Sequence, residues 1–150
     1  MIKEITIERL KKFSHDDAVG IGKLGPSLSA RFDDSPMGDE MLRKIVESPS
    51  HAQIVARDET GKIVGAVTMN TVYAPFAGRI GYLEEIVVDA DTQGGGIGGK
   101  LWDAAVAWAR EQGLDRIEFT SRKDRAATHA FYEKRGAFVR ESNPYRFELE

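Results

Sequence analysis

The fold is decided by residues 80–108, which read IGYLEEIVVDADTQGGGIGGKLWDAAVAW. This stretch begins with an apolar, strand-like run that carries two adjacent carboxylates, Glu84 and Glu85. Five glycines follow within the six residues 94–99, and a segment with the apolar spacing of a helix comes next. A strand, a glycine loop and a helix in this order build an anion cradle from backbone N–H groups and a helix N-terminus. The stretch therefore predicts an anion site with two carboxylates beside it.

Composition and charge narrow the class of protein. A chain of 150 residues suits one domain with one core, spanning residues 1–150. The net charge of −3 argues against a general nucleic-acid or membrane surface. The absence of cysteine excludes disulfides, thiolate ligands and a cysteine nucleophile, and the spacing of His15, His51 and His129 predicts no metal site. Since neither a signal peptide nor a membrane-spanning apolar run is recognisable, we expect a cytoplasmic protein.

Apolar periodicity and turn residues divide the rest of the chain into short elements. Before the glycine loop we expect a strand at 2–7, a weak helix at 14–24 that Pro26 ends, a loop at 26–38, a helix at 39–47, a hairpin of strands 52–57 and 63–70, and a strand at 80–89. After the loop we expect a helix at 98–112, a strand at 116–121, a helix at 126–135, and a terminal strand pair at 138–150 that is broken at 142–144. The loop at 26–38 is expected to be mobile or to face a substrate.

The order of these elements predicts an α+β fold in a single domain. Three consecutive strands joined by short turns favour antiparallel pairing, whereas the glycine loop and its helix form a crossover between two strands of one sheet. We therefore expect a mixed, mostly antiparallel sheet of about six to seven strands, flanked by about four helices.

The glycine loop matches two nucleotide-binding patterns incompletely. The dinucleotide pattern G-x-G-x-x-G requires an acidic residue at the end of the next strand, and here that strand ends in TSR at 120–122. The phosphate-loop pattern G-x-x-x-x-G-K ends at Lys100, but Leu101 stands where Ser or Thr must hold magnesium. A tight connection alone would not need so many glycines, so close approach of the backbone to a ligand is the better explanation.

A third pattern, Q/R-x-x-G-x-G/A, fits residues 93–98, and here the chain resembles the acetyl-coenzyme A loop of the GNAT superfamily of N-acetyltransferases. A second signature, AFYEKRGAF at 130–138, is similar to the superfamily's F-Y-x-K-x-G-F helix end. The resemblance covers about two thirds of the chain, from Ala52 onward, and is closest to small bacterial members of unassigned substrate and to glucosamine-phosphate N-acetyltransferases. It implies a GNAT-like fold and acetyl-coenzyme A as co-substrate.

The resemblance also implies how the coenzyme is bound. Backbone N–H groups of residues 93–98 hold the pyrophosphate with the helix dipole behind them. The backbone of residues 86–88 pairs with the pantetheine arm, and the N–H of Val87 or Val88 serves the thioester oxygen. Arg125 stands where the superfamily often has Asn, within a cluster that could meet coenzyme phosphates or an anionic substrate. The expected coenzyme-binding residues are Ile86, Val87, Val88, Gln93, Gly94, Gly95, Gly96, Ile97, Gly98, Gly99, Lys100 and Arg125.

Two carboxylates and one tyrosine are the candidates for proton transfer. Glu84 and Glu85 are candidate bases, because a carboxylate in an apolar strand has a raised affinity for protons. Alternation puts Glu84 on the face of Tyr82 and Ile86 and Glu85 on the face of Leu83 and Val87, but a bulge, which the superfamily has in this strand, would swap these faces. The choice between them stays open, and one of the two is an ordinary solvated residue.

The resemblance makes Tyr132 the acid that protonates the leaving thiolate, although a tyrosine packed against Phe131 is the structural alternative. Together these residues predict an enzyme that moves an acetyl group to a primary amine of a small molecule by direct attack, since no cysteine is present to carry the acyl group. A non-catalytic acyl-coenzyme A sensor and an acetyltransferase of protein lysines or N-termini are the alternatives. We expect the amine site at 24–36, at 73–76 and near Tyr145, and Phe138, Tyr145 and Phe147 are candidates for a homodimer interface.

Overall fold

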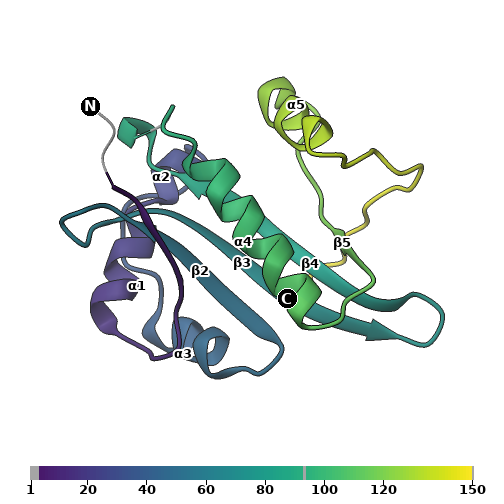
Figure 1. Cartoon of the computed structure of the whole chain (residues 1–150), viewed down its shortest axis with the longest axis horizontal. Coiled ribbons are helices and arrows are strands. Elements are labelled where there is room, and N and C mark those ends of the chain that lie inside the picture. The colour runs from purple at the N-terminus through teal and green to yellow at the C-terminus, as the bar shows by residue number, and fades with distance from the viewer. Residues whose placement is uncertain (1–3, 93, 150) are drawn as a thin grey trace. The chain divides into compact units, whose positions relative to one another are not determined.

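The computed structural model describes residues 4–92 and 94–149, which form two compact units, Met1–Glu118 and Phe119–Glu150. The first unit contains the sheet and most of the helices, and the second contains α5 (Figure 1). In chain order the elements are β1 (Thr6–Arg9), α1 (His15–Gly22), α2 (Gly25–Leu28), α3 (Asp39–Glu47), β2 (His51–Arg57), β3 (Ile63–Ala74), β4 (Gly78–Val88), the 3-10 turn η1 (Ala90–Thr92), α4 (Ile97–Glu111), β5 (Arg116–Glu118) and α5 (Ala126–Lys134).

The described strands form one five-stranded sheet in the order β1-β2-β3-β4-β5. The first four strands pair antiparallel with their neighbours, and β5 pairs parallel with β4 after the crossover through α4. This confirms the prediction of an α+β fold with a mixed, mostly antiparallel sheet. Four helices of eight or more residues accompany it, together with the four-residue turn α2.

The sheet has fewer strands than expected because the terminal pair does not form within 138–149. Tyr145 and Phe147 alternate with polar residues as in a strand, but Phe138, Tyr145 and Phe147 are 82%, 92% and 88% exposed. A strand pair that buries no apolar face is marginal in water, so alternation alone does not secure it. The strand expected at 116–121 is also shorter and ends at Glu118.

A serine cap and a proline mark where the first two helices begin. The Ser14 hydroxyl accepts a hydrogen bond from the backbone N–H of Asp17, which confirms the expected start of α1. Pro26, expected to end this helix, instead lies in the first turn of α2, where proline needs no N–H donor. The predicted bounds of α3 agree with the structure.

The segment expected to be a mobile or substrate-facing loop packs closely against α1. A Cβ added to Gly22 would lie 2.1 Å from the carbonyl oxygen of Ser35, and the N–H of Met37 donates to the carbonyl of Ala18 at 3.1 Å. Gly22 lowers the helical propensity of α1, but a residue without a side chain is needed here for the close approach.

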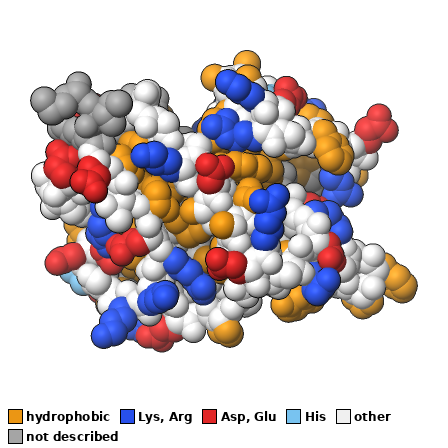
Figure 2. Space-filling view, viewed as in Figure 1, with side chains coloured by type: hydrophobic (Ala, Val, Ile, Leu, Met, Phe, Trp, Pro, Cys, Tyr) orange, Lys and Arg blue, Asp and Glu red, His pale blue; other side chains and the backbone are white. Residues whose placement is uncertain are grey.

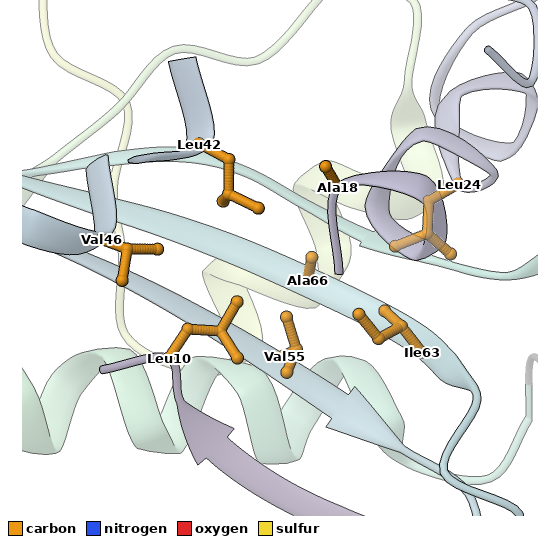
Figure 3. Packing of buried hydrophobic residues seen from close by; sticks show 8 residues of the cluster. All are labelled: Leu10, Ala18, Leu24, Leu42, Val46, Val55, Ile63 and Ala66. Atoms are coloured by element: carbon orange, nitrogen blue, oxygen red, sulfur yellow. The ribbon is translucent and has the colours of Figure 1, made fainter. Parts of the chain in front are cut away.

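The two faces of the sheet carry different helices. Ala66 of β3 joins a buried cluster with residues of α1 and α3 and with Leu24, the N-cap of α2. Figure 3 shows this cluster as Leu10, Ala18, Leu24, Leu42, Val46, Val55, Ile63 and Ala66. The adjacent Gly65 points the other way, because a Cβ added there would lie 3.0 Å from Leu101 and 3.1 Å from Ile97 of α4. Buried Leu101, Ala105 and Trp108 confirm the predicted apolar stripe of α4. On the visible surface, basic and acidic side chains are interspersed (Figure 2).

An ion pair between α1 and α3 makes stability depend on pH. His15 Nδ1 lies 2.8 Å from Asp39 Oδ1, and this hydrogen bond raises the pKa of His15 above its usual 6.5. A raised folded-state pKa adds stability below the unfolded value, and this stability is lost as the pH rises through the folded value. We predict that His15→Gln lowers the melting temperature at about pH 5.5 but not at about pH 9.

The double variant His15→Gln/Asp39→Asn is the control for this prediction, because the coupling between the two substitutions should be present only at the lower pH. A His15→Gln effect of the same size at both pH values would contradict the role given to the ion pair.

Candidate functional site

The pairing of β4 with β5 covers only the first part of β4. Ile80, Gly81 and Tyr82 lie opposite the three residues of β5, and β5 ends at Glu118. The stretch 83–88 of β4 therefore lies beyond this pairing, although β3 follows β4 on its other edge as far as Val88. A sheet edge of this kind can accept an extended ligand as an additional strand. Ile86, Val87 and Val88, the residues expected to contact the pantetheine arm, lie in this stretch.

A β-bulge determines which way the two glutamates face. Ala66 lies opposite Val87, and Thr68 lies opposite Glu84, so two steps along β3 match three steps along β4. This is the bulge that the resemblance implies. Ala66 and Thr68 share a face of β3, and directly opposed residues also share a face. Glu84 therefore shares its face with Val87, whereas simple alternation had paired it with Ile86.

The two carboxylates lie on opposite faces of the sheet and therefore have different surroundings. Glu84 lies on the face of Ala66, which is the face that packs against α1, α2 and α3. Glu85 follows on the opposite face, which it shares with Leu83 and with α4. Both glutamate side chains are exposed, so the sequence-based expectation that the apolar strand would desolvate them is wrong for the described structure.

The glycine loop leads into α4 with the geometry of an anion cradle. Gly94 and Gly96 have φ values of +95° and +75°, which favour glycine, and a Cβ at either would meet nothing within 4 Å. Gly96 is the N-cap of α4, and its carbonyl accepts the first helical hydrogen bond from Lys100 at 3.1 Å.

The first N–H groups of α4, from Ile97 to Gly99, have no acceptor within the helix, and the positive end of its dipole lies there. This donor set fits a pyrophosphate, and the exposed side chain of Lys100 adds a positive charge beside it. Gln93, which is also expected to bind the coenzyme, lies outside the described residues.

The remaining predicted site residues belong to the second unit. Tyr132 is 8% exposed, and its ring centroid lies 4.4 Å from that of Phe119 and 5.2 Å from that of Phe131. Arg125 is the N-cap of α5, and its carbonyl accepts a hydrogen bond from the N–H of His129 at 3.0 Å. The structure thus places Glu84, Glu85 and the cradle in one unit, and an association of Tyr132 or Arg125 with them is a proposal.

Sequence reasoning missed two polar residues on the face of Glu84. Thr68 lies directly opposite Glu84, and Gln53 of β2 lies directly opposite Thr68. The Thr68 hydroxyl donates to Gln53 Oε1 at 2.7 Å. The only sequence signal was one glutamine within the apolar run 52–56, and its partner depends on a strand register that no local pattern contains.

A pocket of about 330 Å³ in the first unit lies between α1 and the β2–β3 turn, away from the predicted site residues. Arg57 lines it and bonds to Glu8 at 2.5 Å and to Asp17 at 2.9 Å, so its charge is used to join β1, β2 and α1. The described residues contain no cluster of three or more His, Asp or Glu side chains suited to a metal ion. None of the described helices is long and apolar enough to cross a membrane.

Comparisons with known proteins identify the family of the chain. A model of the acetyltransferase (GNAT) family matches residues 23–137. The chain therefore belongs to the acetyltransferase (GNAT) family, which is a class of acyltransferases.

Two curated relatives and one solved structure illustrate the likeness. Mycothiol acetyltransferase of Salinispora tropica is 33% identical over 97 residues, which cover 64% of this chain and 31% of the relative. Glucosamine 6-phosphate N-acetyltransferase 1 of Oryza sativa subsp. japonica is 31% identical over 90 residues, which cover 55% of this chain and 54% of the relative. The chain thus matches less than two thirds of either relative.

The crystal structure of an aminoglycoside acetyltransferase from an uncultured soil metagenomic sample, in complex with sisomicin, has a similar fold. It superimposes with a TM-score of 0.82 at 22% identity and covers 97% of this chain and 96% of that one. At this identity the likeness establishes the fold.

The left-handed cap of α4 can be tested by substitution. We predict that Gly96→Ala lowers the free energy of unfolding by about 1 kcal/mol, because a Cβ is strained at a φ of +75°. Gly96→Asn should cost less, since asparagine tolerates this conformation better. Urea unfolding followed by circular dichroism measures both.

Gly95→Ala is the matched control for Gly96→Ala, because the nearest atom to a Cβ at Gly95 lies at an ordinary 3.8 Å and its φ is not left-handed. Equal losses for Gly96→Ala and Gly96→Asn, or an unaffected Gly96→Ala, would show that this cap does not constrain α4.

Proposed function

We propose that the chain transfers the acetyl group of acetyl-coenzyme A to a primary amine of a small molecule. The observation that carries the proposal is that the part of β4 beyond its pairing with β5 leads toward the anion cradle. The edge of β4 beyond Tyr82 ends at Val88, and α4 begins at Ile97, so we propose that an extended arm and its phosphates follow one path along them. Acetyl-coenzyme A supplies an activated thioester carbonyl with a good leaving group.

The residues of the chain have distinct roles in this proposal. N–H groups at 94–99 bind the pyrophosphate, and the backbone at 86–88 orients the arm. A carboxylate of the Glu84–Glu85 pair accepts a proton from the amine, which frees its lone pair to attack the carbonyl. The Tyr132 hydroxyl donates a proton to the leaving sulfur. Because this tyrosine belongs to the second unit, its role presumes that the two units meet at the site.

Relatives support a small polar amine as acceptor. The names of the two curated relatives refer to mycothiol and to glucosamine 6-phosphate, and the solved structure is described as an aminoglycoside acetyltransferase in complex with sisomicin. We therefore propose an acceptor of the amino-sugar type, with hydroxyl groups near the reacting amine.

Release of free thiol from acetyl-coenzyme A tests the proposal. We predict release that depends on an amine from a panel of amino sugars, aminoglycosides and polyamines. Substitution of the catalytic carboxylate by its amide, in Glu84→Gln or Glu85→Gln, should lower kcat by roughly 10²-fold to 10⁴-fold, and Tyr132→Phe should lower it as well. Glu111→Gln, an exposed glutamate at the end of α4, is the matched control and should leave the rate unchanged.

Each alternative has its own result in this assay. Coenzyme binding without thiol release on any acceptor would make the chain an acyl-coenzyme A sensor and overturn the enzymatic proposal. Release only with lysine peptides or peptide N-termini would overturn the small-molecule acceptor. If acetyl-coenzyme A neither binds nor releases thiol, the proposed function is wrong altogether.

A further inference from the structure

A row of polar side chains crosses the sheet on the face of Glu84. In the strand register, Gln53 of β2 lies directly opposite Thr68 of β3, and Thr68 lies directly opposite Glu84 of β4. Exposure increases along this row: Gln53 is 3% exposed, Thr68 is half-buried and Glu84 is exposed. The row therefore leads from the buried interior of the sheet to its accessible side.

The hydrogen bonds of Gln53 determine that the Thr68 hydroxyl is a donor toward Gln53. Gln53 Nε2 donates to the carbonyl oxygen of Val67 at 3.3 Å, so the amide turns its Oε1 toward Thr68. Thr68 Oγ1 donates to this oxygen at 2.7 Å. A hydroxyl has only one proton to donate, so its oxygen retains lone pairs that can only accept.

Thr68, which carries this acceptor oxygen, lies directly opposite Glu84 in the strand register. Cβ atoms of directly opposed residues in an antiparallel pair are about 4.5 to 5.5 Å apart, so one ligand group can contact both side chains. The Thr68 oxygen can only accept a further hydrogen bond, and the carboxylate opposite it carries a negative charge. Together they suit a ligand group with several N–H donors and a positive charge, such as a primary ammonium.

We infer that Thr68 and Glu84 form the subsite for the acceptor amine, with Gln53 as a positioning residue that orients the Thr68 hydroxyl. The inference rests on the proposed acetyl transfer and assigns the proton acceptor within it. Glu84 accepts a proton from the ammonium, and Thr68 Oγ1 accepts a hydrogen bond from a remaining N–H. Glu85 lies on the opposite face and does not take part.

The protons and bonds of this step balance. A nitrogen–carbon bond forms at the thioester carbonyl as the carbon–sulfur bond breaks. The ammonium begins with three protons. One stays on the amide nitrogen, one passes through Glu84 to water, and the third replaces the proton that the acid gives to the leaving sulfur. The Thr68 hydroxyl keeps its own proton, which it donates in a hydrogen bond to Gln53 Oε1 throughout.

Neighbouring residues on this face define the class of acceptor. His51, Asn70 and Tyr82 form the next row of directly opposed residues, and all three side chains are half-buried. Imidazole, amide and phenol groups donate and accept hydrogen bonds, so they suit hydroxyl groups next to the amine rather than an alkyl chain. The subsite therefore favours hydroxylated amines over simple alkylamines.

The test compares Thr68→Val, which removes the hydroxyl with little change in shape, with Thr68→Ser, which restores it. We predict that Thr68→Val lowers kcat/KM for the amine about tenfold or more, the loss expected for a hydrogen bond to a charged group, while KM for acetyl-coenzyme A stays unchanged. Thr68→Ser should recover most of the activity, and Gln53→Met should show a smaller loss of the same kind. Thr71→Val, the same substitution on the opposite face of β3, is the matched control.

The pH dependence of kcat/KM separates positioning from folding. The basic group assigned to Glu84 should remain visible as the acidic limb of the profile in Thr68→Val, and should disappear in Glu84→Gln but not in Glu85→Gln. If the wild type is active but Thr68→Val leaves kcat/KM for the amine unchanged, or Glu85→Gln alone removes the limb, the inference is wrong and the proposed function stands. A wild type that releases no thiol overturns the proposed function itself.

Discussion

One extra residue in β4, opposite Val67, is the constraint on which the rest of the site depends. It places Glu84, instead of Glu85, opposite Thr68 and brings Val87 onto the face of Glu84. Bulges bend the strand that contains them and increase its twist. The pairing of β4 with β5 ends at Tyr82, two residues before Glu84, where the bulge begins. The same part of β4 therefore supplies an edge for an extended ligand and a carboxylate on either side of it.

The cradle at α4 is held in place by the core. Leu101 and Ile97 pack against the face of Gly65, and the buried stripe of α4 fixes the helix along the sheet. The N-terminus of the helix therefore lies just beyond the end of β4, where the proposed function has the backbone itself bind the pyrophosphate. Binding by backbone N–H groups is consistent with a loop that is nearly all glycine.

Local patterns predicted the elements that bury their own apolar face. The bounds of α3 and the stripe of α4 followed from helical spacing, and the hairpin of β2 and β3 followed from the turn at 58–62. What could not be predicted depends on partners distant in sequence. Tyr145 and Phe147 alternate with polar residues as in a strand. A strand forms there only if a second strand pairs with it and buries these side chains, which are exposed in the structure. The faces of Glu84 and Glu85 depend on the register with β3, and so does the link between Gln53 and Thr68.

The most direct test of this account is backbone hydrogen–deuterium exchange with and without acetyl-coenzyme A. Exchange of amides at 86–88 and 94–99 should slow when the coenzyme binds, because both segments then donate hydrogen bonds to it. The β2–β3 turn and the adjacent pocket beside α1 should be unaffected. Protection confined to that pocket, or no change at β4 and the glycine loop despite binding, would contradict the central claim that this strand and cradle hold the coenzyme.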